Sequence, residues 1–167
     1  MQVFFVSPTI SHYLMDISRT IGLAHTSVKK NLDILVKSGQ IIESIEKKGA
    51  RRFPIYRANM DIGFRQQKML YNLSAIIDSG LVKRLEDALS PKSIVLFGSF
   101  RRGEDTEESD IDIFVECRKE GIDLRSFERK LGRKIELHFN ENFRKIPEEL
   151  RNNIINGIVL SGFLVGY

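Results

Sequence analysis

The chain has 167 residues, of which 42% are hydrophobic and 29% charged, with a net charge of +4 and a single cysteine, Cys117. These values are typical of one medium or two small globular domains, and they exclude a collagen-like fibre, an internal disulfide and a cysteine-rich zinc site. The longest apolar runs are only a few residues and the first residues lack a signal-peptide pattern, so we expect a cytoplasmic protein without a membrane-spanning helix.

The positive charge is concentrated in the first third of the sequence. Residues 1–60 carry nine Lys and Arg against four Asp and Glu, a net charge of +5, while residues 61–167 carry 17 basic and 18 acidic side chains, a net charge of −1. Such asymmetry suggests a basic module joined to one with a different role. We therefore expect a first domain over residues 1–60, linker helices over 61–90 and a second domain over 91–167.

Two helices are predicted near the start of the chain. Apolar residues at spacings of three and four predict a short amphipathic helix over residues 12–21, with Ser11 as a candidate N-cap. The same spacing predicts a second helix that begins near Thr26 and ends before Gly39. The turn between them, residues 22–25, has the length of a helix-turn-helix connection.

A hairpin is predicted next. Residues 41–46 and 53–56 have the composition of strands, and the basic turn between them contains Gly49. Pro54 cannot donate a ladder hydrogen bond, so we expect its strand at the edge of a sheet.

This order of elements, carried by the pattern of residues 17–42, resembles a winged helix-turn-helix domain. The resemblance implies that the second helix enters the major groove of DNA and that the hairpin contacts the backbone or minor groove. It implies a DNA-facing set on these two elements: Ser27, Lys29, Lys30, Lys47, Lys48, Arg51 and Arg52. Only about ten residues precede the predicted helices, so the family's first helix must be short or distorted.

Two other interpretations of this domain remain open. The lysines of the second helix could form an ordinary solvated face, and the hairpin could contact another protein. We favour DNA binding because basic side chains occur on both the helix and the hairpin.

Linker helices are predicted over residues 61–89, where apolar residues recur at mostly helical spacing. We expect a break at Ser79-Gly80 and an end before Pro91. The favoured interpretation is a connecting segment that packs on both neighbours, and a homodimer seam is the alternative.

The second module begins with an apolar run, residues 93–97, that predicts a buried strand. Gly98 and Ser99 follow at once, and a glycine there allows a phosphate to approach backbone amides and a hydroxyl. Asp110 and Asp112 alternate with isoleucines, so on a strand both carboxylates point to one face. Neighbouring carboxylates suit a divalent cation such as Mg²⁺ or Mn²⁺, although an acidic edge strand without a ligand has the same pattern.

A third carboxylate comes from another predicted strand, residues 134–139. A predicted helix within residues 123–132 connects the two strands, so Glu136 can lie beside the acidic pair. His138 lies on the same face, but a lone histidine more often fills a core or rim position, and we do not assign it as a ligand. Two other acids could take the place of Glu136: Glu116 and Glu141.

A resemblance to a known family rests on four short segments: Gly98-Ser99, Arg102-Gly103, Ser109 to Ile113, and Ile135 to Leu137. Together they resemble the minimal nucleotidyltransferases of bacteria and archaea, in the DNA polymerase β-type nucleotidyltransferase superfamily. The resemblance implies an α+β fold in which helices flank a small mixed β-sheet. It implies catalytic and metal-binding roles for three carboxylates: Asp110, Asp112 and Glu136. It implies nucleotide binding by four residues: Gly98, Ser99, Arg102 and Ser109.

The family's mechanism implies an enzyme that uses Mg²⁺ or Mn²⁺ to transfer a nucleoside monophosphate, AMP from ATP, to a hydroxyl group. By the same resemblance, the acceptor is a partner protein, because some minimal nucleotidyltransferases act as antitoxins that modify HEPN-type toxins. Two alternatives stay open. One is a DNA-binding transcriptional regulator whose nucleotidyltransferase fold senses a nucleotide without catalysis, and the other is an interaction scaffold with neither activity.

Overall fold

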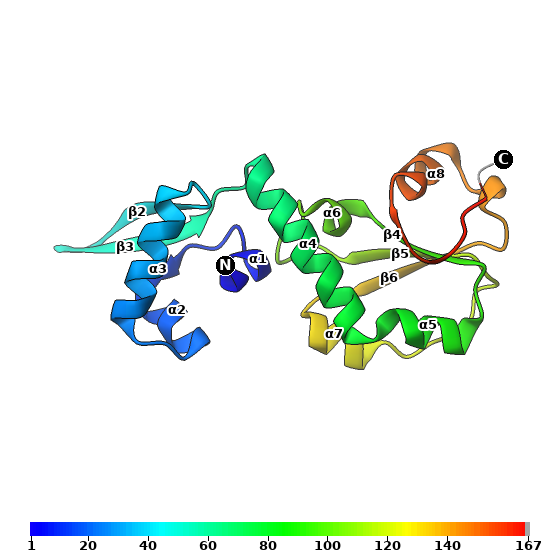
Figure 1. Ribbon diagram of the computed structural model, residues 1–167, viewed down its shortest axis with the longest axis horizontal. Helices are drawn as coiled ribbons and strands as arrows, with labels where there is room; N and C mark the ends of the chain where they lie inside the picture. Colours follow the sequence, from blue (N-terminus) through cyan, green and yellow to red (C-terminus); the bar gives the residue numbers. More distant parts are fainter. Residues whose placement is uncertain (166–167) are drawn as a thin grey trace. The chain divides into compact units, whose positions relative to one another are not determined.

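The computed structural model describes residues 1–165 and divides the chain into two compact units, Met1–Gln66 and Gln67–Tyr167 (Figure 1). The predicted second domain ends at Tyr167, so its last two residues lie outside the described part. None of the helices in the described part has the length and apolarity that a membrane span requires. The predicted α+β class is confirmed, since helices and two separate sheets are both present.

Three helices open the first unit: α1 (Gln2–Val6), α2 (Leu14–Ile21) and α3 (His25–Lys37). The first is a single turn, which agrees with the expected short helix. Gly22 ends α2 with a φ of 67°, a left-handed conformation that glycine adopts without a steric penalty. Buried side chains of α2 and α3, including Ile17 and Leu32, contribute to the core of this unit.

The start of α2 differs from the prediction. We expected a helix from residue 12 capped by Ser11, but His12–Tyr13 form a short strand, β1, and Tyr13 takes the N-cap position. The reason is tertiary, because His12 pairs with Tyr56 and Tyr13 pairs with Ile55 of the hairpin. Pairing with a distant strand therefore overrides the local helical spacing.

The hairpin consists of β2 (Ile41–Lys48) and β3 (Arg51–Ala58), which are longer than the predicted strands. The strand order β1-β3-β2 places β3 in the centre, so the expectation that Pro54 marks an edge strand is wrong. The pairing with β1 stops at Ile55, however, and Pro54 has a paired strand only on its β2 side. Locally, proline still occupies an edge position, where a missing N–H is tolerated.

Two helices follow, α4 (Ile62–Ser79) and α5 (Leu81–Leu89). The predicted break is confirmed, because Gly80 separates them with a φ of 82°. The division between the two units falls within α4, so most of this helix and all of α5 belong to the second unit.

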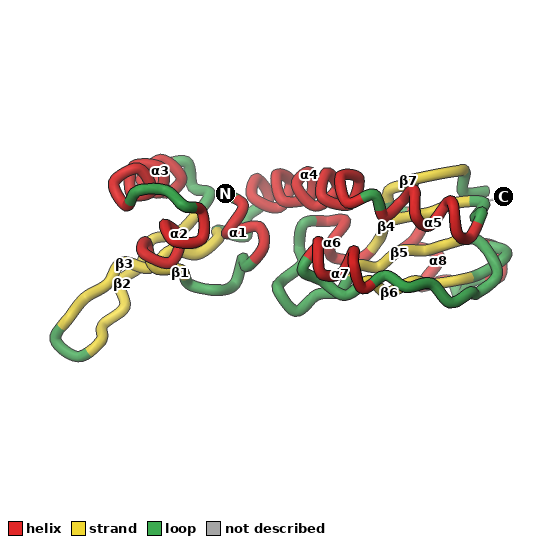
Figure 2. Tube along the Cα trace, turned by 90° about the horizontal axis from the view of Figure 1, so that it is seen from below, coloured by secondary structure: helices red, strands yellow, loops and turns green. Residues whose placement is uncertain are grey.

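The second unit is built on four strands: β4 (Ser93–Phe97), β5 (Ile111–Val115), β6 (Ile135–Phe139) and β7 (Ile158–Gly162). They are ordered β6-β5-β4-β7, with β6 and β7 at the two edges (Figure 2). Only the β5–β6 pair is parallel, because α7 (Arg125–Leu131) connects these strands as a crossover. This is the mixed sheet that the resemblance implied.

Both faces of this sheet are covered. One face carries a core cluster that includes Ile76 of α4, Leu85 of α5 and Ile113 of β5. The opposite face carries Phe114 of β5, which packs with a cluster that includes Ile154. Figure 1 shows α5 and α7 on one side of the sheet and α8 (Glu148–Ile155) on the other. The remaining elements are α6 (Gly98–Arg102), directly after β4, and a 3₁₀ turn, η1 (Phe143–Lys145).

A buried ion pair joins α4 to the loop between α6 and β5. Lys68 and Asp105 form this pair, with side chains that are 0% and 1% exposed. Asn72, also buried, donates a hydrogen bond to Oδ1 of Asp105 (2.8 Å) and another to the carbonyl oxygen of Phe100 (2.9 Å). Burial lowers the pKa of the Lys68 ammonium. The loop that leads to β5 is thus fastened to α4 through buried polar side chains.

Candidate active site

The parallel β5–β6 pair brings three potential metal ligands together. Asp112 of β5 and Glu136 of β6 are direct partners across the ladder. Side chains alternate along a strand, so His138 lies on the same face as Glu136. One ligand atom of each of these three side chains lies within 4.8 Å of the others. Two carboxylates and an imidazole at this spacing form a donor set that a divalent cation can use.

Asp112 also lies against the turn that follows β4. Phe97, the last residue of β4, pairs with Asp112 across the sheet. The next residue, Gly98, has a φ of 75°, and a Cβ atom built on it would lie 2.2 Å from Oδ2 of Asp112. A larger residue at this position would force the carboxylate to move, and the positive φ also favours glycine. The predicted phosphate-binding residues Gly98 and Ser99 therefore begin α6 directly beside the acidic cluster.

His138 lies on the expected face, half-buried beside the two carboxylates. Its Nε2 atom lies 3.3 Å from Oδ1 of Asp112, and both side chains are 26% exposed. Its ring packs edge-on against Phe97, with 5.0 Å between the ring centroids. The sequence held one signal for this placement, since His138 follows Glu136 by two residues on a strand.

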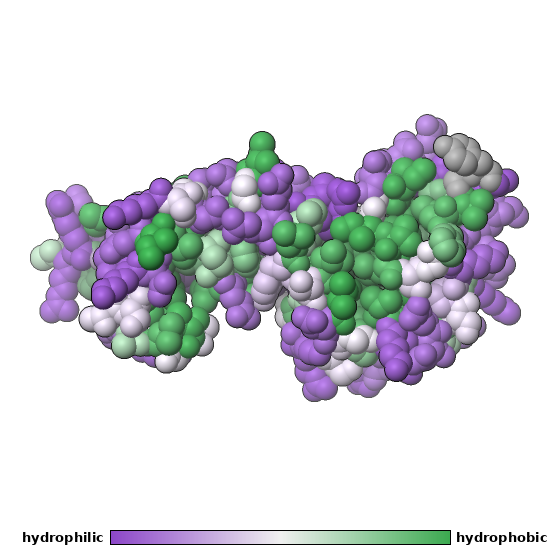
Figure 3. Space-filling model, viewed as in Figure 1, coloured by the Kyte–Doolittle hydropathy of each residue, from purple (hydrophilic) through white to green (hydrophobic). Residues whose placement is uncertain are grey.

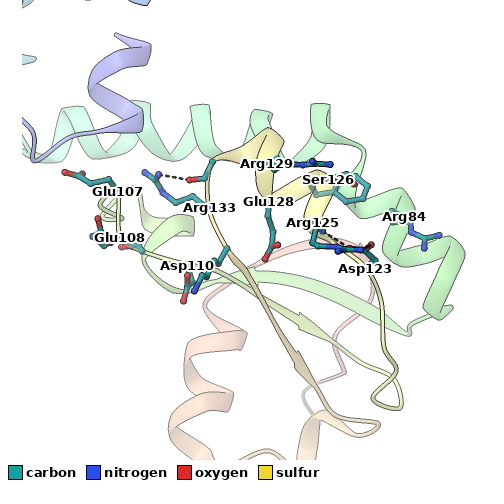
Figure 4. Close-up of a pocket in the computed structure, with 14 residues that line it drawn as sticks. Arg84, Glu107, Glu108, Asp110, Asp123, Arg125, Ser126, Glu128, Arg129 and Arg133 are labelled. Carbon is teal, nitrogen blue, oxygen red and sulfur yellow. Dashed lines mark hydrogen bonds and ion pairs between the residues drawn. The ribbon is translucent and has the colours of Figure 1, made fainter. Parts of the chain in front are cut away.

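Asp110 is not a member of the group of three. β5 begins at Ile111 rather than at Asp110, which is exposed in the preceding loop. Together with Ser109, it lines a cleft of about 1090 Å³ (Figure 4). The structure thus brings two of the three predicted catalytic carboxylates together, Asp112 and Glu136, and places the third at the border of the cleft.

The cleft is lined by charged side chains of both signs from α7 and the neighbouring loops (Figure 4). Some of these charges satisfy one another. Arg125 donates to Asp123 through Nε (3.0 Å) and Nη2 (2.7 Å), which holds the pKa of the Asp123 carboxyl well below its usual range. Glu128 accepts a hydrogen bond from the backbone N–H of Ile135 (3.1 Å), so it fixes the start of β6.

The remaining predicted nucleotide-binding residues have partners within their own loop. Arg102 forms an exposed ion pair with Glu104, with 2.7 Å between Nε and Oε2. An exposed pair of this kind is weak and can open for a phosphate. The Ser109 hydroxyl accepts a hydrogen bond from the backbone N–H of Thr106 (3.0 Å). Ser109 therefore shapes the loop that presents Asp110.

The two suggested substitutes for Glu136 lie elsewhere, so that suggestion is wrong. Glu116 is buried just beyond the end of β5, where it accepts hydrogen bonds from the Ser93 hydroxyl (3.0 Å) and the backbone N–H of Phe143 (3.4 Å). These bonds tie the end of β5 to its neighbours, and they hold the Glu116 carboxylate away from Asp112. Glu141 lies past the end of β6 and lines a different cleft.

The predicted DNA-facing residues of the first unit fall into two groups. Two lysines are engaged internally. Lys29 lies 2.9 Å from Asp33 and 3.2 Å from Glu43, and its hydrogen bond to the Tyr56 hydroxyl is the first of the causes that raise its pKa. Lys48 is exposed, but it pairs with Glu46 at 3.2 Å and lies over an aromatic ring. The others are exposed: Ser27, Lys30, Lys47, Arg51 and Arg52.

Three of the exposed residues cluster around the tip of the hairpin: Lys47, Arg51 and Arg52, here called the hairpin cluster. Gly49 turns the chain between them with a φ of 62°. This end of the hairpin is strongly hydrophilic (Figure 3). The hairpin cluster is thus a compact positive surface within the first unit.

The segment that carries this geometry is similar to known proteins. Residues 79–160 match the family described as "Nucleotidyltransferase domain". Three proteins of Methanocaldococcus jannaschii match shorter segments. "Putative protein adenylyltransferase MJ1379" is 68% identical over 34 residues, and two of the same printed description, MJ0128 and MJ1215, are 43% identical over 61 residues and 48% identical over 46 residues.

These matches cover 20%, 33% and 28% of this chain and 34%, 62% and 54% of the respective relatives. The chain thus spans less than two thirds of each of these relatives. No solved structure gives a significant match. Residues 79–160, which match a nucleotidyltransferase domain, include Gly98, Asp112 and Glu136.

Proposed function

We propose that this chain is a divalent-metal-dependent nucleotidyltransferase that transfers AMP from ATP to a hydroxyl group of a partner protein. The observation that carries the proposal is the placement of the Asp112 carboxylate between Glu136 and the glycine that opens α6. The printed names of the relatives support both the adenylyl group and a protein acceptor. By resemblance, the acceptor is a HEPN-type toxin, and the single cysteine supports a reducing, cytoplasmic setting.

The donor set fits Mg²⁺ or Mn²⁺, with Asp112 and Glu136 as the ligands that would hold it. The bound cation would neutralise phosphate charge and orient in-line attack on the α-phosphate. Gly98 and Ser99 would contact the phosphate oxygens through a backbone N–H and a hydroxyl. Asp110, exposed at the cleft, would join the ligand set when a nucleotide is present.

In the reaction, the acceptor oxygen would form a bond to the α-phosphorus, and the bond to the leaving pyrophosphate would break. The acceptor's proton would pass to a nearby carboxylate, and Glu136 is our candidate because it is exposed beside Asp112. In this proposal, Asp112 binds the cation, and Glu136 both binds the cation and accepts the proton.

The test uses the full chain with α-labelled ATP and Mg²⁺ or Mn²⁺, with and without a lysate of its source organism. We expect labelled protein, and we expect the label to vanish with Asp112→Asn. Asp123→Asn, which alters only an exposed ion pair on the cleft wall, is the matched control and retains transfer. If no label is transferred from any of the four nucleoside triphosphates, the proposal fails.

A second candidate function rests on the hairpin cluster. We propose that the first unit is a winged helix that binds DNA. In this second function, the chain is a transcriptional regulator that binds DNA through the first unit and senses a nucleotide at the candidate active site without catalysis. Such a regulator binds nucleotide and changes its DNA affinity in response, yet transfers no label. Measuring DNA binding with and without ATP alongside the transfer assay separates the two functions.

A further inference from the structure

His138 stands among the acidic ligands, yet neither the sequence pattern nor the family match gives it a role. Its Nε2 atom is 3.3 Å from Oδ1 of Asp112. Two ligands at right angles around a cation with bonds of about 2.1 Å lie about 3.0 Å apart. The Asp112–His138 pair is therefore already close to the spacing of two adjacent ligands of one ion.

The orientation of the imidazole is set by its surroundings. On β5, the residue opposite His138 is Phe114, so His138 is diagonal to Asp112 and shares its face of the sheet. Phe97, only 5% exposed, packs edge-on against the imidazole ring. With the ring packed in this way, its Nε2 atom faces Oδ1 of Asp112, and one ligand atom of each of the three side chains lies within 4.8 Å of the others.

A nitrogen ligand changes which cation such a site prefers. Mg²⁺ is a hard ion that takes oxygen ligands and keeps its water molecules. Imidazole suits transition metals, and Mn²⁺, although it binds most weakly in the first-row series and also suits oxygen ligands, accepts a nitrogen ligand more readily than Mg²⁺ does. We propose that His138 is a direct ligand in this site and that it makes the site select Mn²⁺ over Mg²⁺. The inference rests on the metal site of the proposed function but not on catalysis.

The test measures metal binding without nucleotide or acceptor. Free Mn²⁺ has a strong electron paramagnetic resonance signal that is lost on binding, and competition with Mg²⁺ then gives both affinities. We expect His138→Ala to weaken Mn²⁺ binding at least about tenfold and to leave Mg²⁺ binding within about twofold. His138→Gln keeps a polar side chain of similar length, so it controls for the packing on Phe97 that alanine would lose. Circular dichroism verifies that each variant is folded.

A second readout detects the bond itself. Electron spin echo modulation on the bound Mn²⁺ should show coupling to an imidazole nitrogen in the wild type and in His25→Ala, an exposed control on α3, but not in His138→Gln. Absence of the nitrogen coupling in the wild type, or equal loss of Mn²⁺ and Mg²⁺ binding, overturns the inference. Label transfer is scored separately, so Mn²⁺ bound through His138 without transfer refutes only the proposed function.

Discussion

The buried pair of Lys68 and Asp105 gives the sharpest prediction about stability. Asp105→Ala removes the carboxylate and leaves the Lys68 ammonium with 0% exposure and without its counter-ion. Breaking a buried pair in this way costs about 3–5 kcal/mol of unfolding free energy. The loss of unfolding free energy has an upper limit, because Lys68 can become neutral by releasing its proton. Neutralising a lysine at pH 7, about 3.4 units below its ordinary pKa, costs about 1.4 kcal/mol per unit, or about 5 kcal/mol in total.

The assay is urea unfolding of the full chain, followed by circular dichroism. The double variant Lys68→Met/Asp105→Leu replaces both charges with apolar side chains, and we expect it to regain part of the loss, because Asn72 and Arg133 still lose their contact with the Asp105 carboxylate. Arg125→Ala, which removes the exposed ion pair with Asp123 and keeps the hydrogen bond from the backbone N–H of residue 125 to Asp123, serves as the control and leaves the unfolding free energy nearly unchanged.

The dependence on pH gives an independent check. The folded pKa of Lys68 is lowered by burial, so the folded state binds fewer protons than the unfolded state below the ordinary lysine pKa. Stability therefore rises with pH in that window, and the deficit of Asp105→Ala should narrow as the pH approaches 10. A deficit below about 1 kcal/mol, or a double variant as unstable as the single one, would refute the reasoning.

Three further predictions concern the two units. Gly98→Ala should abolish Mn²⁺ binding in the electron paramagnetic resonance assay, because the new Cβ would lie 2.2 Å from a carboxylate oxygen of Asp112. Retained Mn²⁺ binding would contradict the proposed role of Asp112 as a metal ligand beside Gly98. Replacing the hairpin cluster with alanine should weaken DNA binding and reduce the slope of log binding constant against log salt concentration by up to about 3. Lys29→Ala should leave this slope unchanged, because two carboxylates already pair with that lysine. Fluorescence anisotropy at several salt concentrations measures both slopes. The pKa values of Tyr56 and Lys29 are both raised in the folded state, so their contribution to the unfolding free energy of the first unit is present below about pH 10 and is lost as the pH rises further. Tyr56→Phe should therefore make the unfolding free energy depend less on pH. Urea unfolding at pH 9 and pH 11 measures this dependence.

Local patterns in the sequence predicted the elements whose partners are close in the chain. The buried strand at residues 93–97 has the predicted bounds, since an apolar run followed by Gly98 is a self-contained signal. The break at Gly80 and the strand–helix–strand order around α7 were predicted for the same reason. The strand at His12–Tyr13 was missed because its only support is a distant hairpin.

The candidate site shows the same limit. Alternation placed Glu136 beside Asp112, and the same alternation placed His138 there too, although residue type alone argued against a ligand. Lys68 offered a weaker signal. It lies at helical spacing between Phe64 and Asn72, on a helix face that is buried, where a lone charge requires a partner. Nothing local identified that partner as Asp105, which is 37 positions away and becomes visible only in the folded chain.

The position of β6 at the edge of its sheet has a consequence for how the second unit responds to a cation. β6 is held on one side only, by β5, and the paired carboxylates of Asp112 and Glu136 repel each other across that single ladder. Without a cation, charge repulsion favours fraying of this edge. With a cation, the same two side chains become a clamp, since binding to the assembled pair stabilises only the closed edge. The strand that completes the site is thereby also the strand whose opening the bound metal would suppress.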